Sequence, residues 1–230
     1  MKLSEKFATI LRCGVIWCAV GCLASTLATE AGAQGGGILY GIEGFQTLVE
    51  IDLENEEIVE VGEIGFGVNA LAFHPPTGEL FGIGLVDDDR QLVRISRTTG
   101  AGSVVGPIGF DSASDIAYNP SNGGFYSTVR VGQTGGGASA LIQIDAQTGN
   151  GEVIGETGFQ GFLGLAYDAQ ADSLFGIAAL VEDPSIIELV IVDSATGTST
   201  ANGSVDFTPE GFPTGLTHDP FSDQLNGVHG

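Results

Sequence analysis

Three adjacent aspartates, Asp87, Asp88 and Asp89, form the densest group of carboxylates in the sequence. They stand between two short apolar runs, which places them in a loop. Calcium takes about six to eight oxygen ligands, often from the carboxylates and carbonyls of one loop. Three consecutive side chains cannot all face one ion, and no EF-hand spacing follows them. As the densest group of carboxylates, Asp87, Asp88 and Asp89 are nevertheless the candidate metal site, and calcium is the candidate cofactor. The alternative is a solvated loop that binds no metal.

Other residue types that carry catalysis are scarce. No G-x-S-x-G or H-E-x-x-H motif occurs, and the chain has three histidines. The three cysteines all precede residue 34, and no lysine follows it. Residues 34–230 therefore offer no thiolate nucleophile, no disulfide and no Schiff-base or phosphate-binding lysine. We predict no catalytic residue and no organic cofactor.

The first 33 residues have the pattern of a secretory signal peptide. Lys2, Lys6 and Arg12 precede an apolar run over 13–27, and Ala31-Gly32-Ala33 is a small-residue cleavage site. Export followed by cleavage at this site would release residues 34–230 into the periplasm, onto the cell surface or into the medium. The released chain would not be inserted in a membrane. A membrane anchor is one alternative. A lipoprotein is another, because Ala19-Val20-Gly21-Cys22 resembles a lipobox in which Ala19 replaces the preferred leucine.

The charge of the chain limits its partners. The formal net charge is −22, and residues 34–230 alone carry four arginines and 27 acidic residues, a charge of −23. Such a surface repels nucleic-acid backbones and anionic lipids, so we predict neither as a partner. It suits solubility by self-repulsion, a salty or cation-rich medium, or a cationic partner.

An internal repeat of about 45–50 residues organises the rest of the chain. One block recurs as Leu71–Pro75, Ile116–Pro120 and Leu165–Ala169, with a weaker copy at Leu216–Pro220. A second block recurs out of phase, as Leu48–Asp52, Leu92–Ser96, Leu141–Asp145 and Leu189–Asp193. The blocks are short runs of Val, Ile, Leu, Phe and Tyr bounded by Gly, Pro, Asn and Asp, which is typical of strands and turns. Four strands per repeat and no helical periodicity indicate an all-β protein.

The repeat resembles the WD40/YVTN-like β-propeller superfamily, and within it a repeat of secreted bacterial proteins that reads LYGI, then IDxxTG, then GLAFDPxTGxLYG. This resemblance implies a β-propeller of about four four-stranded blades. The expected domains are a signal peptide at 1–33 and a propeller at 34–230. Its units span about 38–66, 67–111, 112–160 and 161–210, with a partial unit at 211–230.

The two ends of the repeat do not match neatly. Residues 38–42 match the second strand of a unit, so the first unit lacks its inner strand. We expect Leu216–His218 to supply it and close a four-bladed ring. The alternative is an incomplete ring that a partner completes, a second copy of the chain included, because unpaired strand edges attract other strands.

The channel mouth of such a ring is the candidate ligand site, by analogy with other propellers. Asn69, Asp115 and Thr214 stand at the entry to the inner strands, so they are the residues we expect to line it.

We therefore expect a non-catalytic binding or scaffold module whose ligand is a protein or a glycan. The alternatives are a metal-dependent propeller hydrolase of the lactonase or phytase kind, and an acidic structural protein of a cell surface or matrix.

Overall fold

The chain folds into antiparallel β-strands. In the computed structural model, the described residues are 23–29, 38–52, 55, 57–113, 115–130, 138–183, 185–204, 213–219 and 224–229. They form eighteen strands in five sheets, and no helix occurs among them. The described part of the chain accordingly contains no helix long and apolar enough to span a membrane.

Four of the sheets have four strands each, and each sheet pairs its strands in sequence order. The first contains β1 (Leu23–Thr29), β2 (Ile38–Glu43), β3 (Thr47–Asp52) and β4 (Glu57–Glu63). The second contains β5 (Gly67–His74), β6 (Glu79–Val86), β7 (Asp89–Ile95) and β8 (Gly102–Pro107). The third contains β9 (Ala117–Asn119), β10 (Gly124–Arg130), β11 (Ser139–Ile144) and β12 (Gly151–Glu156). The fourth contains β13 (Gln160–Asp168), β14 (Ser173–Ala179), β15 (Ile187–Val192) and β16 (Ser199–Ser204).

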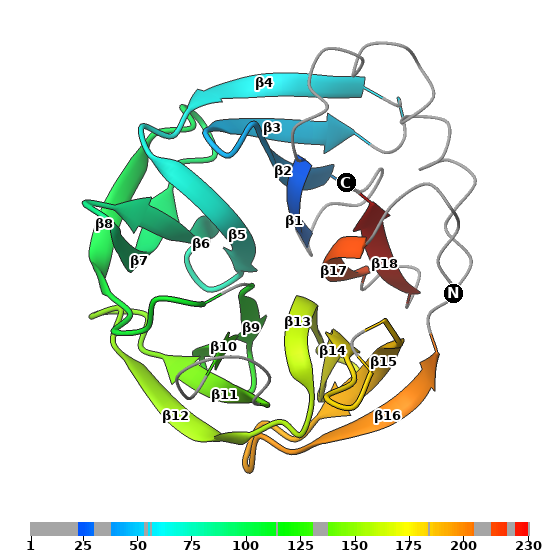
Figure 1. Cartoon of the computed structure of the whole chain (residues 1–230). Coiled ribbons are helices and arrows are strands. Elements are labelled where there is room, and N and C mark those ends of the chain that lie inside the picture. Colours follow the sequence, from blue (N-terminus) through cyan, green and yellow to red (C-terminus); the bar gives the residue numbers. More distant parts are fainter. Residues whose placement is uncertain are drawn as a thin grey trace.

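These four sheets stand around a common axis as the blades of a β-propeller (Figure 1). The first strand of each blade faces the axis and the fourth forms the outer edge. The all-β class and the four four-stranded blades predicted from the repeat are confirmed.

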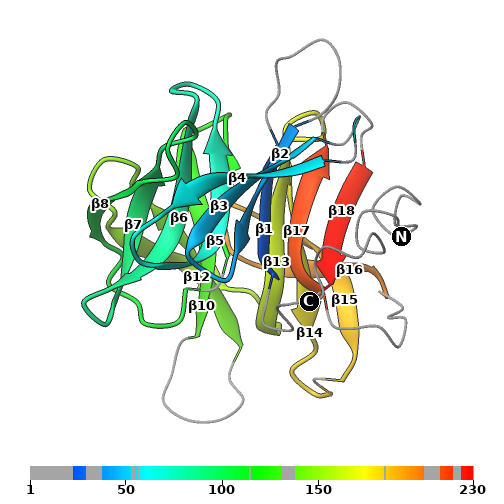
Figure 2. The ribbon, with the colours of Figure 1, turned by 90° about the horizontal axis from the view of Figure 1, so that it is seen from above.

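The closure of the ring differs from the prediction. Strand β17 (Pro213–Asp219) does not pair with β2; it pairs with β18 (Gln224–His229) as a separate two-stranded sheet. This hairpin lies between the first and fourth blades, with β17 next to both β1 and β13 (Figures 1 and 2). The inner strand of the first blade is instead β1, which lies inside the predicted signal segment. The expectation that Leu216–His218 completes the first blade is therefore wrong.

The apolar core lies between the faces of neighbouring blades. Ile42 and Leu48 of the first blade pack with Val93 of the second, and all three are fully buried. The rings of Phe81 and Phe125, on the second and third blades, have centroids 4.9 Å apart. Burial of one such side chain contributes roughly 1.5–3 kcal/mol. The burial of apolar side chains between facing blades is therefore what joins the blades.

Glycines at the outer edge let the blades approach closely. A Cβ on Gly106 of β8 would meet the carbonyl oxygen of Thr148, and a Cβ on Gly149 would meet the backbone of Gly106. The same reciprocal contact occurs between other neighbouring blades, at Gly62 with Thr99–Gly100 and at Gly155 with Thr196–Gly197. In each case a glycine that follows a valine or isoleucine contacts the Thr-Gly turn of the next blade. We call this backbone contact the joint between two blades.

An aspartate holds the turn together before two of the Thr-Gly pairs, and Ser96 takes its place before Thr99-Gly100. Oδ1 of Asp145 accepts the backbone N–H groups of Gln147 at 2.9 Å and Thr148 at 2.7 Å, and the Thr148 hydroxyl at 2.9 Å. The hydrogen bond from the Thr148 side chain, followed by those from the backbone, lowers the pKa of Asp145. Asp193 accepts the N–H groups of Ala195 and Thr196 in the same way. These carboxylates serve the turns.

Candidate functional site

A small polar cavity lies where three blades meet at the entry to their inner strands. Its volume is about 240 Å³. The second blade contributes Asn69 and Arg90, and the fourth contributes Gly161 and Phe162. The third blade and the segment leading into it contribute Ser112, Ala113, Thr128, Val129, Arg130 and Ser139. The lining therefore combines two cations, an amide and three hydroxyls, and none of its described residues carries a carboxylate.

Asn69 stands at an irregularity of its strand. The pairing of β5 with β6 shifts between Val68 and Ala70, so Asn69 has no direct partner on β6. Bulges of this kind redirect a side chain and are frequent beside binding sites. Oδ1 of Asn69 is buried and has no hydrogen-bond partner among the described residues. Three buried side-chain oxygens of the described residues lack a hydrogen-bond partner, and of the residues that carry them, Asn69 is the one that lines this cavity.

The two arginines reach the cavity from different blades. Arg90 lies at the start of β7 and pairs with Leu85 of β6. Arg130 ends β10, and its backbone N–H donates to Ser112 Oγ at 2.8 Å. No carboxylate among the described residues lies within 4.0 Å of either guanidinium, since the ion pair found there joins Arg94 to Glu79.

The hydroxyl groups belong to the walls of the cavity. Ser139 Oγ accepts the backbone N–H of Gly161 at 3.1 Å, which links the third blade to the fourth. Thr128 and Ser139 are both buried. The wall between these blades is thus fixed by hydrogen bonds that do not depend on a ligand.

Asp115 does not line the cavity, although it lies close in sequence to residues that do. Its side chain is 3% exposed. Its Oδ1 accepts the N–H of Ile116 at 2.8 Å, and its Oδ2 accepts the N–H of Leu165 on β13 at 2.6 Å. Burial raises the pKa of Asp115 to about 8, against the opposing effect of these two hydrogen bonds. Asp115 thus joins the third blade to the fourth.

The other predicted site residues lie elsewhere. Asp87 and Asp88 form the turn between β6 and β7, with φ of 51° and 67°, and Val86 pairs with Asp89 across it. Positive φ at both central residues is the geometry of a tight two-residue hairpin. Among the described residues no group of three or more His, Cys, Asp or Glu could hold a metal ion. Thr214 is on β17, but its side chain lies outside the described part of the chain.

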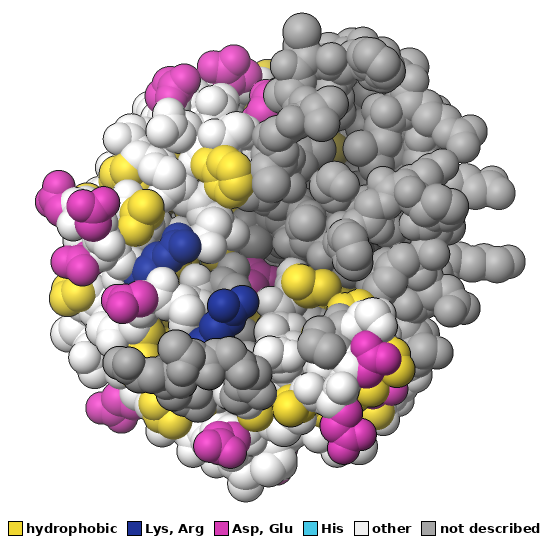
Figure 3. Space-filling view, in the orientation of Figure 1, with side chains coloured by type: hydrophobic (Ala, Val, Ile, Leu, Met, Phe, Trp, Pro, Cys, Tyr) yellow, Lys and Arg dark blue, Asp and Glu magenta, His cyan; other side chains and the backbone are white. Residues whose placement is uncertain are grey.

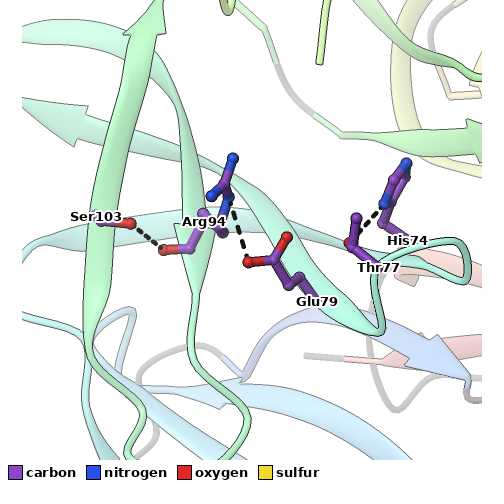
Figure 4. A network of polar contacts seen from close by, with 5 residues as sticks. All are labelled: His74, Thr77, Glu79, Arg94 and Ser103. Carbon is purple, nitrogen blue, oxygen red and sulfur yellow. Dashed lines mark hydrogen bonds and ion pairs between the residues drawn. The ribbon is translucent and has the colours of Figure 1, made fainter. Parts of the chain in front are cut away.

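A second polar network lies at the other end of β5 (Figure 4). His74 Nδ1 lies 2.7 Å from Thr77 Oγ1, which closes the turn between β5 and β6. Arg94 is 3.5 Å from Glu79, and its guanidinium lies over the ring of Phe81. The His74 ring packs edge-on against Tyr118, and burial lowers the pKa of His74. The groups of this network already have protein partners, so it serves the fold.

A larger hollow, of about 460 Å³, is lined by eleven residues of the third blade alone. Asp145, Thr148 and Asn122 are among them, and all three are engaged in turn hydrogen bonds. The cavity shared by three blades is therefore the candidate site, because Oδ1 of Asn69 and the guanidinium groups of Arg90 and Arg130 have no such partner among the described residues.

Comparison with known proteins supports the fold. Neither the family models nor the curated proteins include a match to this sequence. Among solved structures, the chain is similar to the PQQ-bound aldose sugar dehydrogenase of Streptomyces coelicolor, with a TM-score of 0.58 and 17% identity. That alignment covers 88% of this chain and 73% of the other.

Two further solved structures show the same likeness. A gluconolactonase from Xanthomonas campestris aligns with a TM-score of 0.59 and 14% identity, over 90% of this chain and 69% of its own. A chain of the nidogen–laminin complex aligns with a TM-score of 0.61 and 17% identity, over 85% and 70%. At these identities the likeness shows the fold.

The prediction of a non-catalytic module is contradicted by these comparisons. Two of the three similar propellers are enzymes that act on sugars or sugar lactones. The enzymatic alternative is therefore better supported than the binding or scaffold reading. The sequence reasoning rested on the absence of linear motifs, which does not exclude catalysis, because a site assembled from several blades has no linear motif.

Proposed function

We propose that the protein is a hydrolase of small polyhydroxylated lactones, and that the three-blade cavity is its substrate site. The observation that carries this proposal is that Asn69, whose buried Oδ1 has no hydrogen-bond partner among the described residues, lines a small polar cavity. An unpartnered buried acceptor is unfavourable, and a ligand hydroxyl that donates to it removes that cost. The serine and threonine hydroxyls of the wall suit the remaining hydroxyls of a sugar.

The arginines supply one part of what lactone opening requires, the stabilisation of negative charge on the carbonyl oxygen. Attack of water on the carbonyl carbon places negative charge on the carbonyl oxygen; the ring C–O bond then breaks and its oxygen takes a proton. The products are a carboxylate, a new hydroxyl and one released proton. Guanidinium groups fixed beside the carbonyl oxygen stabilise the charge as it develops. The enzymes among the similar propellers support a sugar-derived substrate.

The residues of the cavity do not fit a divalent cation, because none of them carries a carboxylate or an imidazole. No step of this proposal passes through a metal. The metal-dependent form of the hydrolase reading has no support from this cavity.

Proton release tests the proposal. The full chain should accelerate the hydrolysis of glucono-1,5-lactone above its spontaneous rate near pH 6.5, with and without a chelator. Asn69→Ala should lower kcat/KM about three- to tenfold, because one neutral hydrogen bond is lost. The same substitution should leave the thermal stability unchanged or raise it, since it removes an unpartnered buried oxygen.

Asn55→Ala is the matched control, because Asn55 is exposed and bonds only within its own turn, to Asp52. It should leave the rate unchanged. Rates equal to the spontaneous rate across a panel of 1,4- and 1,5-lactones would sink the proposal. Reduction of a redox dye by an aldose after addition of pyrroloquinoline quinone would move the assignment to a dehydrogenase.

A further inference from the structure

The cavity concentrates positive charge in a strongly acidic protein. The chain has a formal charge of −22, and only four of its seven basic residues follow residue 33. Two of those four, Arg90 and Arg130, line the same cavity. Figure 3 shows basic side chains left of the centre of the displayed face, with acidic side chains both beside them and toward the edge.

The other two arginines have partners within the protein. Arg94 pairs with Glu79 at 3.5 Å. The guanidinium of Arg97 lies 5.3 Å from the ring centre of Phe73 and 5.8 Å from that of Tyr40, within the range of cation–π attraction. The guanidinium groups of Arg90 and Arg130 make no such ion pair or ring contact among the described residues.

The backbone holds both arginines in place. The carbonyl oxygen of Arg90 accepts the N–H of Ile108 at 3.0 Å, which anchors the start of β7. Arg130 pairs with Ser139 on β11 and donates its N–H to Ser112 Oγ. The backbone of each arginine is thus fixed in its own blade, and the two residues line the cavity from these two blades.

A solvated pair of surface arginines is the ordinary alternative. It does not account for the absence of a carboxylate from the cavity when the chain carries 29 acidic residues. Asp89 directly precedes Arg90 in the chain, yet it is not within ion-pair distance of the guanidinium. In the part of the chain that the structure describes, two arginines without an ion-pair partner line a partly enclosed cavity that has no carboxylate in its lining, and such an arrangement forms a local anion site.

We infer that Arg90 and Arg130 bind the anionic group of the ligand, so that the cavity takes a small polyol bearing one carboxylate or phosphate. The polyol part of this inference rests on the proposed function, and the anion part rests on the arginines. If the substrate is a lactone, its carboxylate product binds more tightly than the neutral lactone and inhibits the enzyme.

Calorimetric titration of the full chain at fixed ionic strength tests the inference. The probes are gluconate, glucose 6-phosphate and glucose. Binding of gluconate alone assigns the anion as a carboxylate, and binding of glucose 6-phosphate alone assigns it as a phosphate. Equal binding of glucose and the anionic sugars, or no binding of any of the three, would overturn the inference.

Arginine variants give the second arm of the test. Arg90→Gln and Arg130→Gln should each weaken anion binding at least about tenfold, because each removes a charge-assisted hydrogen bond. Arg94→Gln is the matched control: it removes the same charge from the same strand as Arg90 and should leave binding unchanged. Thermal melts of all three variants check that the fold is retained. Unaltered anion binding in the double variant Arg90→Gln/Arg130→Gln would also overturn the inference.

The same preparations separate this inference from the proposed function. Anion binding that depends on the arginines, without lactone hydrolysis, would reject the hydrolase and keep the anion site. Lactone hydrolysis without anion binding would keep the hydrolase and reject the anion site. Added sodium chloride should weaken anion binding to the wild type more than glucose binding, since salt screens charged contacts.

Discussion

Asn69 and Asp115 stand at comparable places in the repeat but have opposite roles. The side chain of Asn69 lines the cavity and its oxygen lacks a partner. Both oxygens of Asp115 accept backbone N–H groups, one of them from the next blade. Sequence position alone marked both as residues of the channel mouth. The difference arises because a bulge redirects one side chain and the fold buries the other.

The raised pKa of Asp115 predicts a pH dependence of stability. Between its ordinary value of 3.8 and about 8, the folded protein holds a proton on Asp115 and the unfolded chain does not. The free energy of unfolding should therefore fall as pH rises through this window, by up to about 1.4 kcal/mol per pH unit. Urea unfolding at pH 5 and pH 8 measures the difference.

Asp115→Asn removes this titration. The variant should be less stable at pH 5, because an amide group can accept only one of the two N–H groups, but its stability should change less between pH 5 and pH 8. Both proteins share the remaining acidic residues, so general charge repulsion affects them alike. Identical pH slopes for wild type and variant would rule out a protonated Asp115.

At the scale of elements, the outer strands are joined by backbone contact. Each joint places the glycine of one blade against the turn of the next, and three pairs of blades repeat it. The repeat shows these glycines in the sequence, but it does not show that they meet across blades. Their sequence separation exceeds one strand, and only the ring brings them together.

Gly106→Ala should destabilise the protein by roughly 1–3 kcal/mol, because the new methyl group overlaps the carbonyl oxygen of Thr148. Gly67→Ala is the control, since a Cβ at Gly67 has no neighbour within 4 Å. The two variants should differ in the midpoint of chemical unfolding. Equal midpoints would mean that the joint accommodates the added methyl group without a loss of stability.

At the scale of the whole molecule, the ring depends on its two ends. Strand β1 pairs with β2 and lies beside both β5 and β17. The signal peptide and its cleavage after Ala33 remain a prediction, and cleavage there would remove β1. A chain that begins at residue 34 should therefore melt at a lower temperature than one that begins at residue 23, because the inner edge of β2 loses its partner. Equal melting temperatures would show that β1 contributes nothing to the ring.

The sequence by itself determined the class of the fold and the number of full blades. It could do so because strands, turns and repeats are local patterns, set by alternating apolar residues, by Asp and Gly at turns, and by a fixed period. The place of Asn69 at the head of an inner strand also follows from the repeat, while its role in binding stays a prediction. The sequence did not point to Arg90 and Arg130, because nothing along the chain indicates that two residues forty positions apart line one cavity.

Only the tertiary structure decided how the ring closes, what the side chain of Asp115 bonds to and which arginines have no ion-pair partner among the described residues. These outcomes depend on the register of strands, on bulges and on the packing of one blade against the next. Such contacts join residues distant in sequence, and their energies are set by geometry that no single segment contains. The candidate site is for this reason a property of the ring, while the blades that carry it are a property of the repeat.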